Sequence, residues 1–180
     1  MRGASLPYYD AIFDTCEVSD ALVGRLGFKR MIVLGRDLPV IRTDARGLGG
    51  EKRALAVGRD SARLAAAVKG GVASACLEEP IMDKELLAAM ADNDCILCVP
   101  MSGIMSAFGL RRARLMYRTG RLISKAEKMG VPVGIVTMAP SNALMCSYMQ
   151  MVELARLMGV EEGFARESIS VTNRRLVEDD

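Results

Sequence analysis

Seven basic side chains lie in the segment LRRARLMYRTGRLISKAEKMG, Leu110–Gly130, where Glu127 is the only acidic residue. On a helix of 100° per residue, five of the seven fall in one sector of about 80°, and a sixth lies just beside it. A row of like charges repels itself unless a polyanion or an acidic surface neutralises it. Guanidinium and ammonium groups can neutralise phosphates, and arginine can bind them in a bidentate manner. We call this set the basic stripe: Arg111, Arg114, Arg118, Arg121, Lys125 and Lys128.

The alternative interpretation of the basic stripe is a solvated helix face. Such faces usually alternate charge sign, so that side chains four residues apart attract each other. The chain as a whole has a formal net charge of +2, so the stripe is a local concentration of charge. The pattern therefore favours a binding role for this segment, with an acidic protein surface as a second possible partner.

Four further basic residues are weaker candidates for phosphate contacts. Lys52 and Arg53 follow Gly47-Leu48-Gly49-Gly50, which does not complete the dinucleotide-binding pattern G-x-G-x-x-G because position 52 is lysine. The P-loop pattern is absent as well, and a flexible turn is the favoured interpretation. Phosphate binding by this loop in a small-molecule enzyme stays open. Arg174 and Arg175 follow an asparagine in an expected turn after the last helix.

Acidic residues follow several expected strands: Asp14, Asp37, Glu78 and Glu79. In parallel α/β folds the carboxyl ends of the strands carry the functional sites, and oxygen ligands suit Mg²⁺. Asp14, Asp37 and Glu78 could therefore build the metal site of a phosphoesterase-like hydrolase. Acidic residues are also common at helix starts, where they meet the positive end of the helix dipole, and we favour that role.

The chain contains no histidine, which excludes Ser-His-Asp and Cys-His nucleophilic sites. Cys95 and Cys98 have C-x-x-C spacing, but a zinc site needs a second pair or histidines. Positions three apart on a strand also point to opposite faces, so we expect two buried core residues. Five cysteines are an odd number, which favours free thiols in a reducing compartment. We expect no metal and no cofactor.

Short apolar runs alternate with helical patterns along the chain. This alternation predicts the α/β class, with mainly parallel strands covered by helices. Six or seven strands in 180 residues fit a compact TIM-barrel-like β/α fold in one domain, residues 1–180, because a full eight-fold barrel needs about 250 residues. An open doubly wound sheet is the alternative. We expect strands at 8–13, 31–34, 40–42, 53–57, 72–77, 95–99 and 131–138, and helices at 18–28, 61–69, 82–92, 110–129, 148–158 and 161–168.

The order of these features resembles the RNase P protein component 3 family, the archaeal relatives of the thirty-kilodalton subunit of eukaryotic RNase P. The opening YYDAIF with Asp10 is similar to the family's aromatic-Asp strand, and LVGRLGFKRMIVLG to the next helix and strand. The C-terminal likeness is more specific: LRRARLMYRTGRLISKAEKMGVPVGIVTMAPSNA, then MVELARLMGVEEGFARESISVTNRRLV. The resemblance covers 108–177 well and 35–105 weakly. The chain departs from the family at Thr172-Asn173-Arg174, where the family often has Asn-Pro.

The resemblance implies a non-catalytic protein subunit that supports the catalytic RNA of ribonuclease P in removing the 5′ leader of precursor tRNA. It implies three partners: the RNase P RNA, another small protein subunit and, indirectly, precursor tRNA. Met101, Met105, Met145 and Met149 lie near expected loops and would suit an adaptable protein interface, although core filling is equally open. No apolar run suggests a membrane span or a secretory signal, so we expect a cytoplasmic protein.

Overall fold

The computed structural model describes residues 7–44 and 53–178. Lys52 and the Gly47–Gly50 loop, both candidates for phosphate binding, lie outside the described residues. In the described part, no helix is long and apolar enough to cross a membrane.

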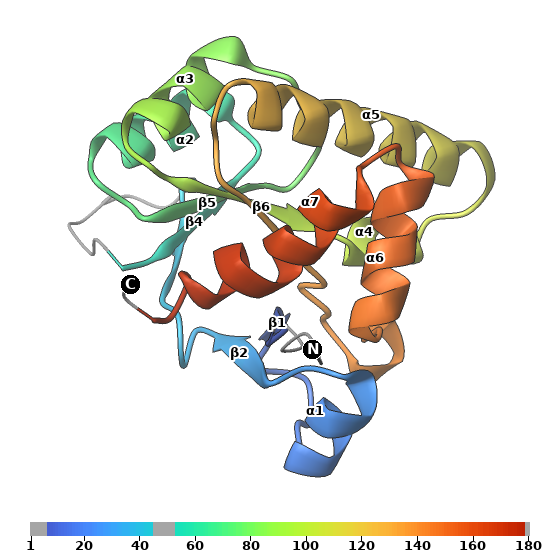
Figure 1. Cartoon of the computed structure of the whole chain (residues 1–180). Coiled ribbons are helices and arrows are strands. Elements are labelled where there is room, and N and C mark those ends of the chain that lie inside the picture. Colours follow the sequence, from blue (N-terminus) through green and yellow to red (C-terminus); the bar gives the residue numbers. More distant parts are fainter. Residues whose placement is uncertain (1–6, 45–52, 179–180) are drawn as a thin grey trace, which may run out of the picture.

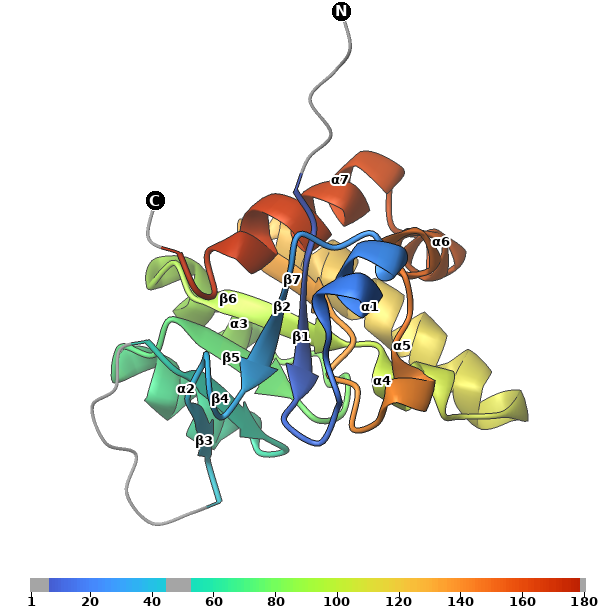
Figure 2. The same cartoon turned by 90° about the horizontal axis from the view of Figure 1, so that it is seen from below.

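Seven parallel strands run through the described residues and pair in two sheets. β1 pairs with β2, and the larger sheet has the order β3-β4-β5-β6-β7 (Figure 2). Two isolated parallel bridges join the sheets: Leu34 with Leu38 between β2 and β3, and Ile12 with Ala139 beyond the end of β7. The strands are β1 (Tyr9–Phe13), β2 (Arg30–Leu34), β3 (Val40–Arg42), β4 (Leu55–Gly58), β5 (Ser74–Leu77), β6 (Ile96–Pro100) and β7 (Val133–Val136).

The strands therefore follow one another around a ring, and the chain has a TIM-barrel-like β/α fold. This confirms the predicted fold class. The alternative of an open doubly wound sheet is wrong, because the two bridges connect the edges that an open sheet would leave unpaired.

Helices cover the outside of the ring (Figure 1). Their starts are fixed by the side chains that the sequence suggests: Ser19 accepts from the backbone N–H of Leu22, and Asp60 caps the second helix. The helices α4 and η1 were not predicted, since both are too short for a periodic pattern. The helices are α1 (Asp20–Leu26), α2 (Ser61–Lys69), α3 (Lys84–Asp92), α4 (Ser102–Met105), α5 (Gly109–Lys128), η1 (Asn142–Leu144), α6 (Tyr148–Leu157), α7 (Glu162–Glu167) and the π-helix η2 (Ser168–Thr172).

Alternate residues of each strand face two separate cores. Side chains such as Tyr9, Leu55 and Cys98 fill the interior of the ring. The intervening residues, such as Ile12 and Leu97, pack between the ring and the helices. This division follows from the two-residue period of strands, and it leaves the strands apolar on both faces, as the sequence predicted.

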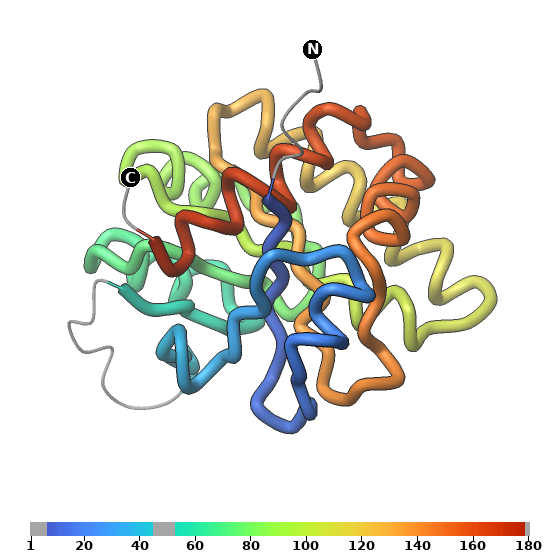
Figure 3. The backbone as a smooth tube through the Cα atoms, turned by 60° about the horizontal axis from the view of Figure 1, so that its bottom comes forward, coloured from blue at the N-terminus to red at the C-terminus, as the bar shows by residue number. Residues whose placement is uncertain are grey.

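The seam between β1 and β7 is closed partly by buried polar side chains. Both oxygens of Asp10 accept hydrogen bonds from Thr137, one from its backbone N–H at 2.7 Å and one from its hydroxyl at 2.6 Å. Asn173 donates from its side-chain nitrogen to the carbonyls of Tyr9 and Ile135, at 2.9 and 2.7 Å. The C-terminal segment thus lies beside the first strand, as the red and blue traces show (Figure 3).

Gly120 lets α5 approach the end of α6. A Cβ at this position would overlap the backbone carbonyl oxygen of Met158. We therefore expect Gly120→Ala to lower the free energy of unfolding by about 3 kcal/mol, because a backbone group cannot move aside as a side chain can.

Gly24→Ala is the matched control for this prediction, since Gly24 also lies inside a helix and nothing lies within 4 Å of a Cβ built there. It should raise the free energy of unfolding by roughly 0.5 kcal/mol. Denaturant unfolding of both variants measures the difference. Equal stability of the two would show that α5 and α6 can separate without loss.

Candidate nucleic-acid interface

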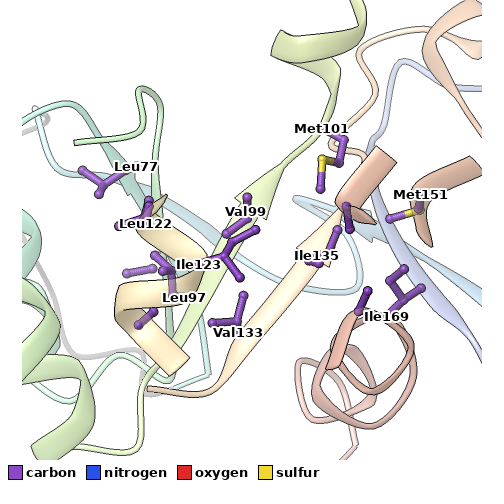
Figure 4. Close-up of a cluster of buried hydrophobic side chains, with 14 of the residues drawn as sticks. Leu77, Leu97, Val99, Met101, Leu122, Ile123, Val133, Ile135, Met151 and Ile169 are labelled. Atoms are coloured by element: carbon purple, nitrogen blue, oxygen red, sulfur yellow. The ribbon is translucent and has the colours of Figure 1, made fainter. Parts of the chain in front are cut away.

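The basic stripe stands on a helix whose opposite face is held by the core. Leu122, Ile123 and Ala126 are buried, and Leu115 is half-buried against the same core. Figure 4 shows Leu122 and Ile123 directed at the side chains of β6 and β7. The segment therefore packs through an apolar sector, and this packing fixes the direction in which the stripe faces.

The stripe itself is open to solvent. Its arginines and Lys128 are exposed, while Lys125 is half-buried. Within residues 7–44 and 53–178, no acidic side chain forms an ion pair with any stripe residue. No ion pair in the described part of the chain therefore relieves the self-repulsion of the stripe, while Glu78 and Glu79 line a groove together with Arg111, Arg114 and Arg118.

One half of the stripe borders a groove at the carboxyl end of the strands. The groove has a volume of about 480 Å³, and Arg111, Arg114 and Arg118 line it. Arg59, which directly follows β4, lines the same groove and pairs with Glu78 at 2.6 Å. Sequence reasoning missed Arg59. The sequence signal for Arg59 is its position directly after a strand, because the carboxyl ends of strands carry functional residues in such folds.

The remaining described basic candidates lie elsewhere. Arg53 donates to the backbone carbonyl of Val177, and Arg175 pairs with Asp94 at 2.5 Å. Arg174 lies 4.0 Å from Glu178 and is still helical, which corrects the expected turn for this residue, whereas Arg175 lies in a turn as expected. Arg53 precedes β4, and Asp94, the partner of Arg175, precedes β6, so both contacts lie at the amino ends of the strands. The groove lined by Arg59 lies at the opposite, carboxyl ends, and the three arginines are therefore not part of it.

The three carboxylates of the alternative metal site do not come together. Across the described residues, no three His, Cys, Asp or Glu side chains form a group that could hold a metal ion. Asp14 is exposed, whereas Asp37 accepts a hydrogen bond from the backbone N–H of Val33 at 2.9 Å. Partial burial acts to raise the pKa of Asp37, but this hydrogen bond and Arg36 hold it below its usual value. Asp37 thus fixes a turn.

Glu78 is held by two arginines at the mouth of the ring. One oxygen accepts from Arg42 at 3.0 Å and the other from Arg59 at 2.6 Å. Glu78 also lines a cavity of about 210 Å³ whose walls are mostly apolar, with Ser102 among its few polar side chains. Both carboxylate oxygens of Glu78 are therefore already engaged in ion pairs within the chain.

Cys95 and Cys98 are buried free thiols in different cores, as the strand period predicted. Burial raises the pKa of Cys95 to about 12, and burial also raises the pKa of Cys98 well above its usual value. Both thiols are consequently protonated at neutral pH, which suits packing rather than metal binding or nucleophilic attack.

The four methionines suggested for a protein interface mostly fill the core. Met101 is fully buried, and Met105 and Met145 pack against the core from its edge. Only Met149 of the four is exposed, at 44%. The interface interpretation is therefore wrong for Met101, because its side chain belongs to the core between the ring and the helices.

We expect the purified chain to show no phosphoesterase activity with Mg²⁺ or Mn²⁺. The reason is the missing histidine together with the dispersed carboxylates. A chromogenic phosphodiester assay measures this, with Asp14→Asn as the control. Metal-dependent hydrolysis that Asp14→Asn abolishes would favour the hydrolase alternative instead.

No known protein-family model matches the sequence, and no curated protein matches it. Solved structures do share its fold. A chain in the cryo-EM structure of archaeal ribonuclease P with mature tRNA is similar with a TM-score of 0.65 and 17% identity, over 94% of this chain and 79% of that chain.

Two other similar structures are A. niger ochratoxinase and a Xaa-Pro dipeptidase with bound methionine in the active site. Their TM-scores are 0.58 and 0.54, and their identities are 14% and 17%. The alignments cover 79% and 69% of this chain, which spans only 40% and 33% of the length of those proteins. At such low identity the likeness shows only a shared fold. This fold occurs in a chain of the RNase P structure and in these two proteins alike.

Proposed function

We propose that this chain is a protein subunit of ribonuclease P that binds the RNase P RNA through the basic stripe. The observation that carries the proposal is the row of cations on α5, which lacks ion-pair partners in the described part of the chain. The fold likeness to a chain of archaeal ribonuclease P supports it, because that likeness extends over 94% of this chain.

The geometry suits contact with a structured RNA backbone. From Arg111 to Lys128 the helix rises by about 25 Å, and stripe residues recur every three or four positions. The cations therefore lie one above the other along a rigid axis. A helix anchored by its apolar face loses little conformational entropy when it binds, so it can position the RNA without itself changing shape.

The proposal includes a supporting role rather than a catalytic one. In it, Arg59 extends the phosphate-binding surface from the stripe towards the strand ends, and Arg53, Arg174 and Arg175 are secondary RNA contacts. A second small protein subunit and, through the RNA, precursor tRNA are the other partners. The compartment that we propose is the cytoplasm, where transfer RNA is processed in an archaeal cell.

Affinity purification of the tagged chain from its native host tests the proposal. We expect RNase P RNA, a second small protein and cleavage of the 5′ leader of precursor tRNA to co-purify. The Arg118→Ala/Arg121→Ala variant should recover less of the RNA. Recovery of a folded chain with no RNA at low salt would contradict the proposal.

A further inference from the structure

A second groove lies beside the other half of the basic stripe, and it is lined partly by apolar and partly by cationic side chains. It has a volume of about 330 Å³ and lies between α5, the end of α6 and the segment before α3. Tyr117, Met82 and Met158 provide apolar surface. The polar lining consists of Arg121, Ser124, Lys125 and Lys128.

Tyr117 is the unusual member of this surface. Its side chain is 64% exposed in the middle of a helix that otherwise presents cations to solvent. The Arg121 guanidinium lies over its ring, 5.9 Å from the centroid, and donates to its hydroxyl at 3.4 Å. Sequence reasoning treated this segment as charge alone and assigned no role to the ring.

The floor of the groove is backbone. Gly120 and Gly159 both line it, and the close approach of α5 to Met158 leaves no room for a side chain at position 120. Figure 1 shows the upper end of α6 close to α5.

We propose that this groove binds one unpaired nucleotide of an RNA, with its base stacked on Tyr117 and its phosphates contacted by Lys125 and Lys128. The inference rests on the proposed function and deepens it, because it names the kind of RNA element that α5 contacts. Sequence-specific RNA recognition commonly uses unpaired bases that stack on aromatic or arginine side chains. A duplex buries its bases within the stack, so only a bulge, loop or end offers such a base.

Charge complementarity favours RNA over an apolar protein segment. Within the described residues the groove contains three cations and no carboxylate, and none of the three is in an ion pair there. An apolar protein segment would leave these charges desolvated without partners, which is costly. A nucleotide provides both a flat ring for the tyrosine and an anionic backbone for the cations.

Two labelled RNA hairpins of equal length test the inference by fluorescence anisotropy: one with a bulged adenosine and one with a fully paired stem. Tyr117→Ala should weaken binding of the bulged hairpin by about tenfold, because it removes the binding free energy of one stacked base. Binding of the paired hairpin should not change. Tyr117→Phe keeps the stacking surface and should bind both like the unsubstituted chain. The slope of log K against log salt should not change, since no charge is removed.

Phe108→Ala is the matched control, because Phe108 is 83% exposed but does not line this groove. Equal losses on both hairpins, or no loss on either, would overturn the inference. Loss of a co-purifying protein on Tyr117→Ala, with RNA binding intact, would overturn it too and assign the groove to a protein. The proposed function fails separately, if Arg118→Ala/Arg121→Ala leaves RNA binding unchanged.

Discussion

Replacing both Arg118 and Arg121 by alanine is expected to lower the affinity of the chain for RNase P RNA by about ten- to a hundredfold at low salt. The two arginines lie in the middle of α5, away from its fraying ends, and their side chains are exposed. Each lost phosphate contact should reduce the slope of log K against log salt by roughly 0.7 to 0.9, because fewer counterions are released. Binding titrations at several salt concentrations measure both quantities.

The fold should survive this double substitution. Alanine is a good helix former, and the buried face of α5 is not altered, so the free energy of unfolding should change by less than about 0.5 kcal/mol. The matched control is Arg25→Ala/Lys69→Ala, which removes two exposed cations from α1 and α2. The control should keep its RNA affinity. An unchanged salt slope in a folded stripe variant would mean that the stripe is merely solvated or faces an acidic protein.

Substitution of Asp10 by asparagine is expected to stabilise the protein above neutral pH by about 3 kcal/mol. Asp10 is completely buried at the seam of β1 and β7, and burial raises its pKa from 3.8 to about 7. The folded state therefore favours the protonated acid. Its contribution to stability is full below about pH 4 and is lost progressively as the pH rises to 7, because the unfolded chain ionises first.

Asparagine has the same shape and carries no charge. Its Oδ1 can accept from the backbone N–H groups of Ala11 and Thr137, while its side-chain N–H can donate to the Thr137 hydroxyl. Unfolding free energies at pH 5, 6, 7 and 8 should consequently fall less steeply with pH for Asp10→Asn than for the unsubstituted chain. The exposed Asp14→Asn is the control and should follow the unsubstituted chain. Parallel pH profiles for Asp10→Asn and the unsubstituted chain would count against a raised pKa.

Asp10→Ala separates the charge from the hydrogen bonds. It leaves the backbone N–H groups of Ala11 and Thr137 buried without an acceptor, which costs about 1–3 kcal/mol each. This variant should be less stable than Asp10→Asn at every pH. The difference in unfolding free energy between Asp10→Ala and Asp10→Asn measures what the hydrogen bonds of this side chain contribute to stability, independently of its ionisation.

Local pattern accounts for most of the elements. Helix α1 lies within the predicted range 18–28 with Ser19 and Gly27 as its caps, and the segment predicted at 110–129 forms one helix with a buried apolar face. These features follow from side-chain chemistry within a few residues, such as capping and the 3.6-residue period. The short helix α4, Ser102–Met105, was not predicted, because four residues are too few to show a helical period.

The sequence by itself determined that the chain is a parallel α/β fold and that α5 carries a row of like charges, because both depend on the order of residues along the chain. It also determined that Cys95 and Cys98 face opposite sides of one strand. The sequence allowed both a closed ring and an open sheet. Only the tertiary structure decided for the ring, since the bridge between Ile12 and Ala139 joins segments far apart in the chain whose pairing leaves no mark in the sequence. The tertiary structure likewise decided which charges stay together. Arg59 lies in the same groove as part of the stripe, whereas Asp14, Asp37 and Glu78 do not form a group that could hold a metal ion. Both outcomes depend on how strand ends and helices pack in space.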